Sequence, residues 1–205
     1  MTRVSETSTR EARTGEVRTA VDETARARGR LQGLLRQREE LRDLLLSAEQ
    51  LARGAAAKAS AEAEASGAMG TGPRCFLFVC GARLREVASG AARGALLLPP
   101  ETDIPGGQEE WPPWIQSAEQ AAARAAAASP GMERLLMQAS LLALESELAL
   151  AGQGQQAAEL AGEISHLADL LREAGRRLPA QCTETVWAAR EAAGKCENSK
   201  PGRPR

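Results

Sequence analysis

The strongest constraint on this chain is a spacing. From residue 17 to residue 59, small and apolar residues recur at alternating steps of three and four, which brings them onto one stripe of an α-helix. About six successive heptads exceed the three or four that indicate a coiled coil. The positions are Val17, Ala20, Thr24, Ala27, Leu31, Leu34, Arg38, Leu41, Leu45, Ala48, Ala52, Ala55 and Ala59. We therefore predict a long coiled-coil helix over residues 17–66, preceded by a disordered segment at residues 1–16.

Three residues of this segment bear on whether the helix packs against a partner chain or against helices of its own chain. Arg38 occupies a core position, where a charged side chain weakens a dimer or fixes its register. Leu35 and Leu44 flank the stripe and widen it towards that of a helix in a bundle. The helix can therefore form a coiled coil with a partner chain or lie inside a monomeric bundle. We favour the coiled coil.

Composition supports helices throughout the chain. Hydrophobic residues make up 43% of the sequence but aromatic residues only 2%, and tyrosine is absent. Aromatic side chains each bury about 150–250 Å² in a compact core, so a chain this poor in them suits helices that pack through alanine and leucine. We predict an elongated all-α fold, a coiled coil or helical bundle with a Pro/Gly-rich central linker and a disordered C-terminal tail.

The centre of the chain interrupts the helical pattern. Residues 99–114, PPETDIPGGQEEWPPW, hold five prolines and two glycines, which is typical of a linker. The apolar run Cys75–Cys80 could form one strand, but a single strand cannot form a sheet, so we expect a buried segment there, irregular or helical, or one that packs poorly. We predict an irregular Gly/Pro-rich linker over residues 67–114. Trp111 and Trp114 either form a short docking motif or pin this linker onto the helices, and we favour the second.

Apolar residues return in residues 115–178, in two runs separated by nine residues without a heptad match. The first run is Met137, Leu141, Leu144, Leu148 and Ala151, and the second is Leu160, Ile164, Leu167, Leu171, Ala174 and Leu178. Gly152 and Gly154 lie in the gap, where they favour a turn. We predict a hairpin of two antiparallel helices, with one long helix as the alternative.

Prolines suggest the remaining boundaries. Ser129-Pro130 has the residue types of a helix start, and Pro179 those of a helix end. Residues 179–205 are predicted to form a short helix, at about residues 184–193, and a disordered tail.

The leucine positions also define the predicted protein interface. Residues 137–151 are apolar around so much of the helix that neighbours are needed on at least two sides. Because the alanine-rich segments leave the core small, we expect some of these neighbours to come from a second chain, either another helical protein or a second copy. The predicted interface residues are Leu31, Leu34, Leu41, Leu45, Leu141, Leu144, Leu148, Leu160, Ile164, Leu167 and Leu171.

The sequence carries no signature of catalysis, of a metal site or of a cofactor. His166 is the only histidine, and the pairs Cys75/Cys80 and Cys182/Cys196 fall outside the spacing of zinc sites. The glycines form no phosphate-binding loop. We therefore expect no enzymatic activity, no cofactor and no small-molecule substrate.

Charge and hydropathy limit the remaining partners. The net charge is −1, so no strong field attracts the chain to nucleic acid or to anionic membranes. Its apolar runs are far shorter than the ~20 residues that span a bilayer, so we expect no membrane insertion. The first thirty residues are rich in Arg, Ser and Thr, but their acidic residues argue against a mitochondrial transit peptide.

These observations favour a non-enzymatic coiled-coil subunit or adaptor of a larger multiprotein assembly, cytoplasmic and of cytoskeletal or trafficking type. The alternative is a nuclear or nucleic-acid-associated regulator that uses the basic segments 25–30 and 199–205, although both are short and lack interleaved aromatics. A third hypothesis is a poorly folded chain, because residues 53–98 are rich in Gly and Ala.

Overall fold

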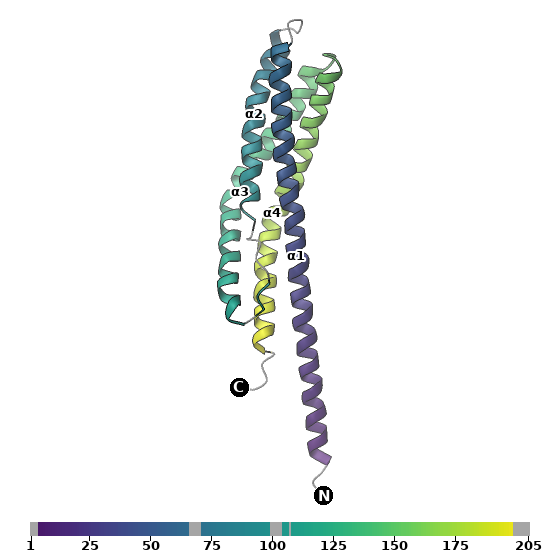
Figure 1. Cartoon of the computed structure of the whole chain (residues 1–205), viewed down its shortest axis with the longest axis vertical. Coiled ribbons are helices and arrows are strands. Elements are labelled where there is room, and N and C mark those ends of the chain that lie inside the picture. Colours follow the sequence, from purple (N-terminus) through teal and green to yellow (C-terminus); the bar gives the residue numbers. More distant parts are fainter. Residues whose placement is uncertain (1–3, 66–70, 99–103, 107, 199–205) are drawn as a thin grey trace.

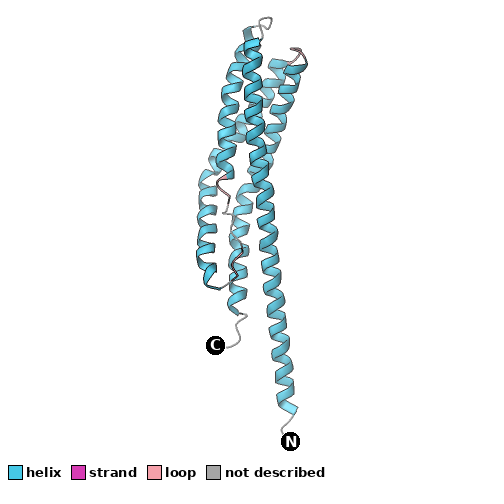
Figure 2. Cartoon of the chain, viewed as in Figure 1, coloured by secondary structure: helices cyan, strands magenta, loops and turns pink. Residues whose placement is uncertain are grey.

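The computed structural model describes residues 4–65, 71–98, 104–106 and 108–198. Its elements are α1 (Val4–Ala65), α2 (Thr71–Ala95), the short 3-10 helix η1 (Gln108–Glu110), α3 (Trp111–Leu150) and α4 (Gln155–Asn198). Within these described ranges there is no β-strand, and the prediction of an all-α fold is confirmed (Figure 2).

The helices run up, down, up and down along one long axis, so the molecule is an elongated antiparallel bundle (Figure 1). With a rise of 1.5 Å per residue, the 62 residues of α1 extend over about 90 Å. Ion pairs join α1 to α4. As the residue number rises along α1, the number of the paired residue on α4 falls, so the two helices are antiparallel. The ion pairs are Glu23–Lys195, Arg30–Glu191, Glu40–Arg177 and Lys58–Glu163.

The core changes composition along this axis. Near the α3–α4 turn it draws on all four helices and includes Ala55, Leu84, Leu142 and Ile164. Past the end of α2, the core continues with Leu41 and Leu45 of α1, Leu98, Ala125 of α3, and Leu178 and Cys182 of α4. Nearest the termini it contains Leu31 and Leu34 together with Trp111, Trp114 and Ala188. One apolar stripe of α1 thus contributes to the core at every level.

The structure corrects the predicted irregular region over residues 67–114, because Thr71–Ala95 forms the helix α2. Its buried positions recur at helical spacing despite the glycines among them: Leu77, Cys80, Gly81, Leu84, Val87, Ala88, Ala91 and Gly94. Glycine lowers helix propensity, but burial of this face outweighs that cost.

The part of the linker that the structure describes packs against the bundle. Leu98 and Pro105 are buried, and the Arg28 guanidinium donates hydrogen bonds to the carbonyls of Pro105 (3.5 Å) and Gly106 (3.4 Å). Trp111 and Trp114 are both buried, with ring centroids 6.3 Å apart in an edge-to-face arrangement. The two tryptophans therefore anchor the start of α3 to α1 and α4.

Two prolines that the sequence suggested as helix boundaries lie inside helices. Pro130 is within α3 and Pro179 within α4, so the short helix predicted at 184–193 is the continuation of α4. Proline removes a backbone donor from a helix, but buried residues on both sides of each proline hold these helices in the core. The N-terminal boundary also moves, because residues 4–16 belong to α1. Of the predicted disordered tail at residues 195–205, residues 195–198 belong to α4, and residues 199–205 lie outside the described residues.

The turn between α3 and α4 lies at the two glycines that the sequence indicated. Gly152 and Gly154 have φ values of 74° and 102°, in the left-handed region that favours glycine. The amide of Gln153 donates to the carbonyl of Leu150 at 3.1 Å, which closes the turn. Residues 115–178 thus contain a helical hairpin, and the alternative of one long helix does not hold.

Two neighbouring leucines of α3 provide a matched test of this packing. Leu142 is 1% exposed in the core, whereas Leu144 is 59% exposed. We expect Leu142→Ala to lower the free energy of unfolding by about 3 kcal/mol, because it leaves a cavity. Leu144→Ala should change it by less than about 1 kcal/mol in the isolated chain. Urea unfolding followed by circular dichroism measures both, and equal losses would contradict this orientation of α3.

Candidate protein interface

The structure separates the predicted interface residues into two groups. The first group is buried inside the chain's own bundle and contains Leu31, Leu34, Leu41, Leu45, Leu160, Ile164, Leu167 and Leu171. Since other helices of the same chain cover these side chains, they stabilise the fold and are not accessible to a second chain. The predicted interface is corrected at these positions.

The contacts of α1 show how its stripe is satisfied internally. Leu31 and Leu34 lie in one cluster with the two tryptophans of α3, and Leu41 and Leu45 lie in another with residues of α4. Arg38, at the core position between them, is 6% exposed and forms an ion pair with Glu39. The side-chain amide of Gln181 donates to the backbone carbonyl of Leu34 at 2.6 Å. This polar contact, which sequence reasoning missed, fixes α4 against α1.

The second group remains on the surface. Leu141, Leu144 and Leu148 are 51%, 59% and 82% exposed, and Met137 is 59% exposed. Steps of four, three and four place these residues along one face of α3, which we call the α3 stripe. The opposite face of the same helix is buried through Leu135, Ala139, Leu142, Ser146 and Leu150. This segment of α3 therefore has two apolar faces, and the bundle covers one.

Carboxylates border the α3 stripe on both sides and are held by neighbouring helices. Glu145 accepts a hydrogen bond from Arg83 of α2 at 2.9 Å, and Glu147 accepts one from the Ser165 hydroxyl of α4 at 3.0 Å. Both acidic side chains are more than one-third exposed. The stripe thus has defined acidic edges.

An apolar residue of α2 extends this surface. Because α2 and α3 are antiparallel and are paired at Arg83–Glu145, one turn along each helix brings Val79 and Leu148 to the same level. Val79 and its neighbour Phe78 are both about half exposed. Other exposed apolar side chains, such as Leu96 and Trp187, lie elsewhere on the bundle and resemble the isolated residues found on most protein surfaces.

The described residues contain no group of three or more metal-ligating side chains, and His166 is exposed on α4. Burial raises the pKa of the Cys80 thiol and that of the Cys182 thiol, each to about 11. At neutral pH both thiols are protonated, and a protonated thiol is a poor nucleophile.

The basic segment at residues 25–30 is engaged in part within the bundle. Arg28 reaches the carbonyls of the linker, and Arg30 forms an ion pair with Glu191 at 3.4 Å. The basic residues at 199–205 lie outside the described part of the chain.

In the part of the chain that the structure describes, no helix combines the length and the hydropathy needed to cross a bilayer. Comparisons with protein-family models, with curated proteins and with solved structures gave no match. The α3 stripe with its acidic edges is the candidate site for binding another protein.

Thiol labelling tests the cysteine environments. We expect iodoacetamide at pH 8 to modify the exposed Cys75 at least about a hundredfold faster than Cys80 and Cys182, which are buried and protonated. Mass spectrometry of the derived peptides measures each rate, and Cys75 serves as the internal control. Denaturation should abolish the difference. Rapid labelling of Cys80 or Cys182 in the folded protein would contradict the placement of α2 or α4.

Proposed function

We propose that this protein is a non-enzymatic helical subunit or adaptor of a larger multiprotein assembly, and that the α3 stripe binds an amphipathic helix of another protein. One observation carries the proposal: Met137, Leu141, Leu144 and Leu148 form an exposed apolar row at heptad spacing on a helix whose other face is already buried. Apolar rows of this kind are typical of helix–helix recognition.

Burial of the stripe would supply the driving force. Full burial of a leucine or methionine side chain contributes about 1.5–3 kcal/mol, and these side chains are already partly covered by their own helix. Association also costs translational and side-chain entropy. Four side chains can form the centre of such an interface, and Val79 and Phe78 would widen it.

The charges at the edges favour a partner other than a second copy of this chain. With Met137 and Leu144 at one core position of the heptad, and Leu141 and Leu148 at the other, the flanking positions hold Glu133, Gln138, Ser140, Glu145 and Glu147. An antiparallel self-pairing that aligns Leu141 with Leu144 would bring Glu147 opposite Ser140 and Glu145 opposite Gln138. A parallel self-pairing would likewise create no pair of opposite charges. A partner helix with Lys or Arg beside its apolar row would pair with these carboxylates.

The free end of α1 supports the same proposal. The pair Glu23–Lys195 lies close to the end of α4, and α1 continues beyond it to Val4 without another described element beside it (Figure 1). An isolated helical segment of this length is marginally stable in water, so this part of α1 would gain from a partner as well.

The stripe can be tested by a triple substitution. We expect Leu141→Gln, Leu144→Gln and Leu148→Gln together to shift the tagged full-length chain from a large complex to the size of the monomer in sedimentation of cell extracts. Circular dichroism of the purified variant should stay helical, since all three side chains are exposed. Leu96→Gln is the matched control, because Leu96 is 79% exposed outside the stripe, and it should leave the complex intact.

Two results would contradict the proposal. The first is a triple variant that stays in the large complex, and the second is a wild-type chain that sediments as a monomer in extracts. Analytical ultracentrifugation of the purified chain tests the choice of partner. A stable homodimer that the triple substitution dissociates would assign the stripe to self-association instead.

A further inference from the structure

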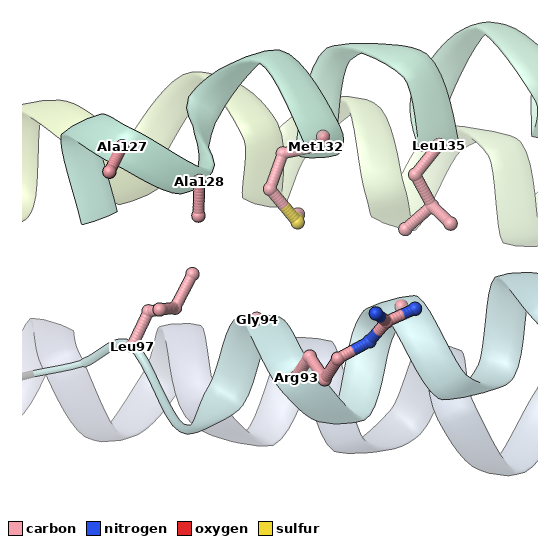
Figure 3. Close-up of a pocket in the computed structure, with 9 residues that line it drawn as sticks. Arg93, Gly94, Leu97, Ala127, Ala128, Met132 and Leu135 are labelled. Carbon is pink, nitrogen blue, oxygen red and sulfur yellow. The ribbon is translucent and has the colours of Figure 1, made fainter. Parts of the chain in front are cut away.

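A groove runs between the C-terminal half of α2 and the middle of α3. Its deeper part is an apolar pocket of about 250 Å³, shown in Figure 3. Its shallower part, of about 520 Å³, is polar and shares Arg93, Gly131 and Leu135 with the pocket, so the two form one continuous groove. We call it the α2–α3 groove. None of its lining residues belongs to the α3 stripe.

Small residues line the deeper part. Gly90 and Gly94 of α2 face α3, on which the lining residues include Ala127, Ala128 and Gly131. Figure 3 places Leu97 across from these alanines and Met132 across from Gly94. At Gly90 the helices approach closely, because a Cβ there would lie 2.4 Å from a methyl group of Leu135. Leu135 thus fills the space at Gly90, and Met132 fills that at Gly94, where a Cβ would lie 3.3 Å from its sulfur. The rest of the pocket is lined by Leu97, Ala127 and Ala128.

Arginines line the shallower part. Arg85 and Arg93 come from α2 and Arg134 from α3, and all three are exposed. Within the described residues, none of them forms an ion pair with a carboxylate: Arg85 donates to the Ser60 hydroxyl at 3.2 Å, and Arg93 to the Ser89 carbonyl at 3.2 Å. Glu86 is the acidic residue in this lining, so positive charge exceeds negative charge there.

We propose that the α2–α3 groove binds a small amphiphilic anion. The apolar body of the ligand would occupy the pocket lined by Leu97, Ala127 and Ala128, and its carboxylate or sulfate would lie near Arg93 and Arg134. Ligand pockets between helices are largely apolar and hold a few polar groups that fix orientation, and guanidinium groups match the geometry of carboxylates. Local sequence pattern does not indicate this site, because the residues that line the groove come from two separate helices.

Decanoate is the probe, and decyltrimethylammonium is the matched cation with an alkyl chain of similar length. Isothermal titration of the full chain, below the micellar concentration of each probe, should give one saturable site for decanoate. The cation should bind at least about tenfold more weakly, because the arginines attract only the anion. Equal affinity for the two probes, or no saturable binding of decanoate, would overturn the proposal.

Gly131→Leu fills the groove without disturbing the fold. A Cβ at Gly131 meets nothing within 4 Å, so leucine fits there, and it is a better helix former than glycine. We expect this variant to bind decanoate at least about tenfold more weakly. Gly162→Leu is the control, because Gly162 lies on α4 with equally open space around it, and it should bind as the wild type does. Unchanged affinity in Gly131→Leu would overturn the proposal.

Substitution of the arginines tests the charged part of the α2–α3 groove. Arg93→Gln with Arg134→Gln should weaken decanoate binding by about tenfold and leave the affinity for the cation unchanged or higher. The exposed Arg36 of α1 lies outside the groove, so Arg36→Gln is the control and should have no effect. An undiminished affinity of the double variant for decanoate would show that the arginines do not select the ligand.

Discussion

The burial of one stripe of α1 against the rest of the chain is the contact on which this fold depends. The stripe has leucine towards the termini and alanine towards the α1–α2 connection, where Ala48, Ala52, Ala55, Ala59 and Ala63 are fully buried. Alanine brings helix axes close together, so backbone and small side chains fill the core that aromatics would fill elsewhere. Close packing of this kind also explains why α2 places Gly81, Gly90 and Gly94 towards its neighbours.

The sequence could predict which face of each helix is apolar but not which helix covers that face. The heptad spacing correctly indicated a long N-terminal helix, and Gly152 and Gly154 correctly indicated the turn. A row of leucines has the same spacing whether its neighbour belongs to the same chain or to another, so Leu31 and Leu144 looked alike. Their environments differ because α3 and α4 fold back onto α1. Local residue spacing cannot predict which distant segments pack together.

The errors in element boundaries have a common cause. Local residue types at Pro130, at Pro179 and in residues 71–95 favour breaks or irregular structure, whereas the structure continues or forms helices there. Each of these segments buries residues on one face, and tertiary burial outweighs a local penalty of a few kcal/mol. The candidate sites were predictable only in part for the same reason. Three exposed leucines of α3 were among the expected positions, but the α2–α3 groove joins residues that no local pattern connects.

The antiparallel course of α1 and α4 gives the molecule two unlike poles. The first described residue of α1, Val4, and the end of α4, Asn198, are at one pole, and the glycine turn that joins α3 to α4 is at the other (Figure 1). Leu148 lies within two helical turns of that glycine pole. A helix bound there would be held tens of ångströms from the N-terminal end of α1. Under the proposed function, this elongated shape would separate two attachments along one axis.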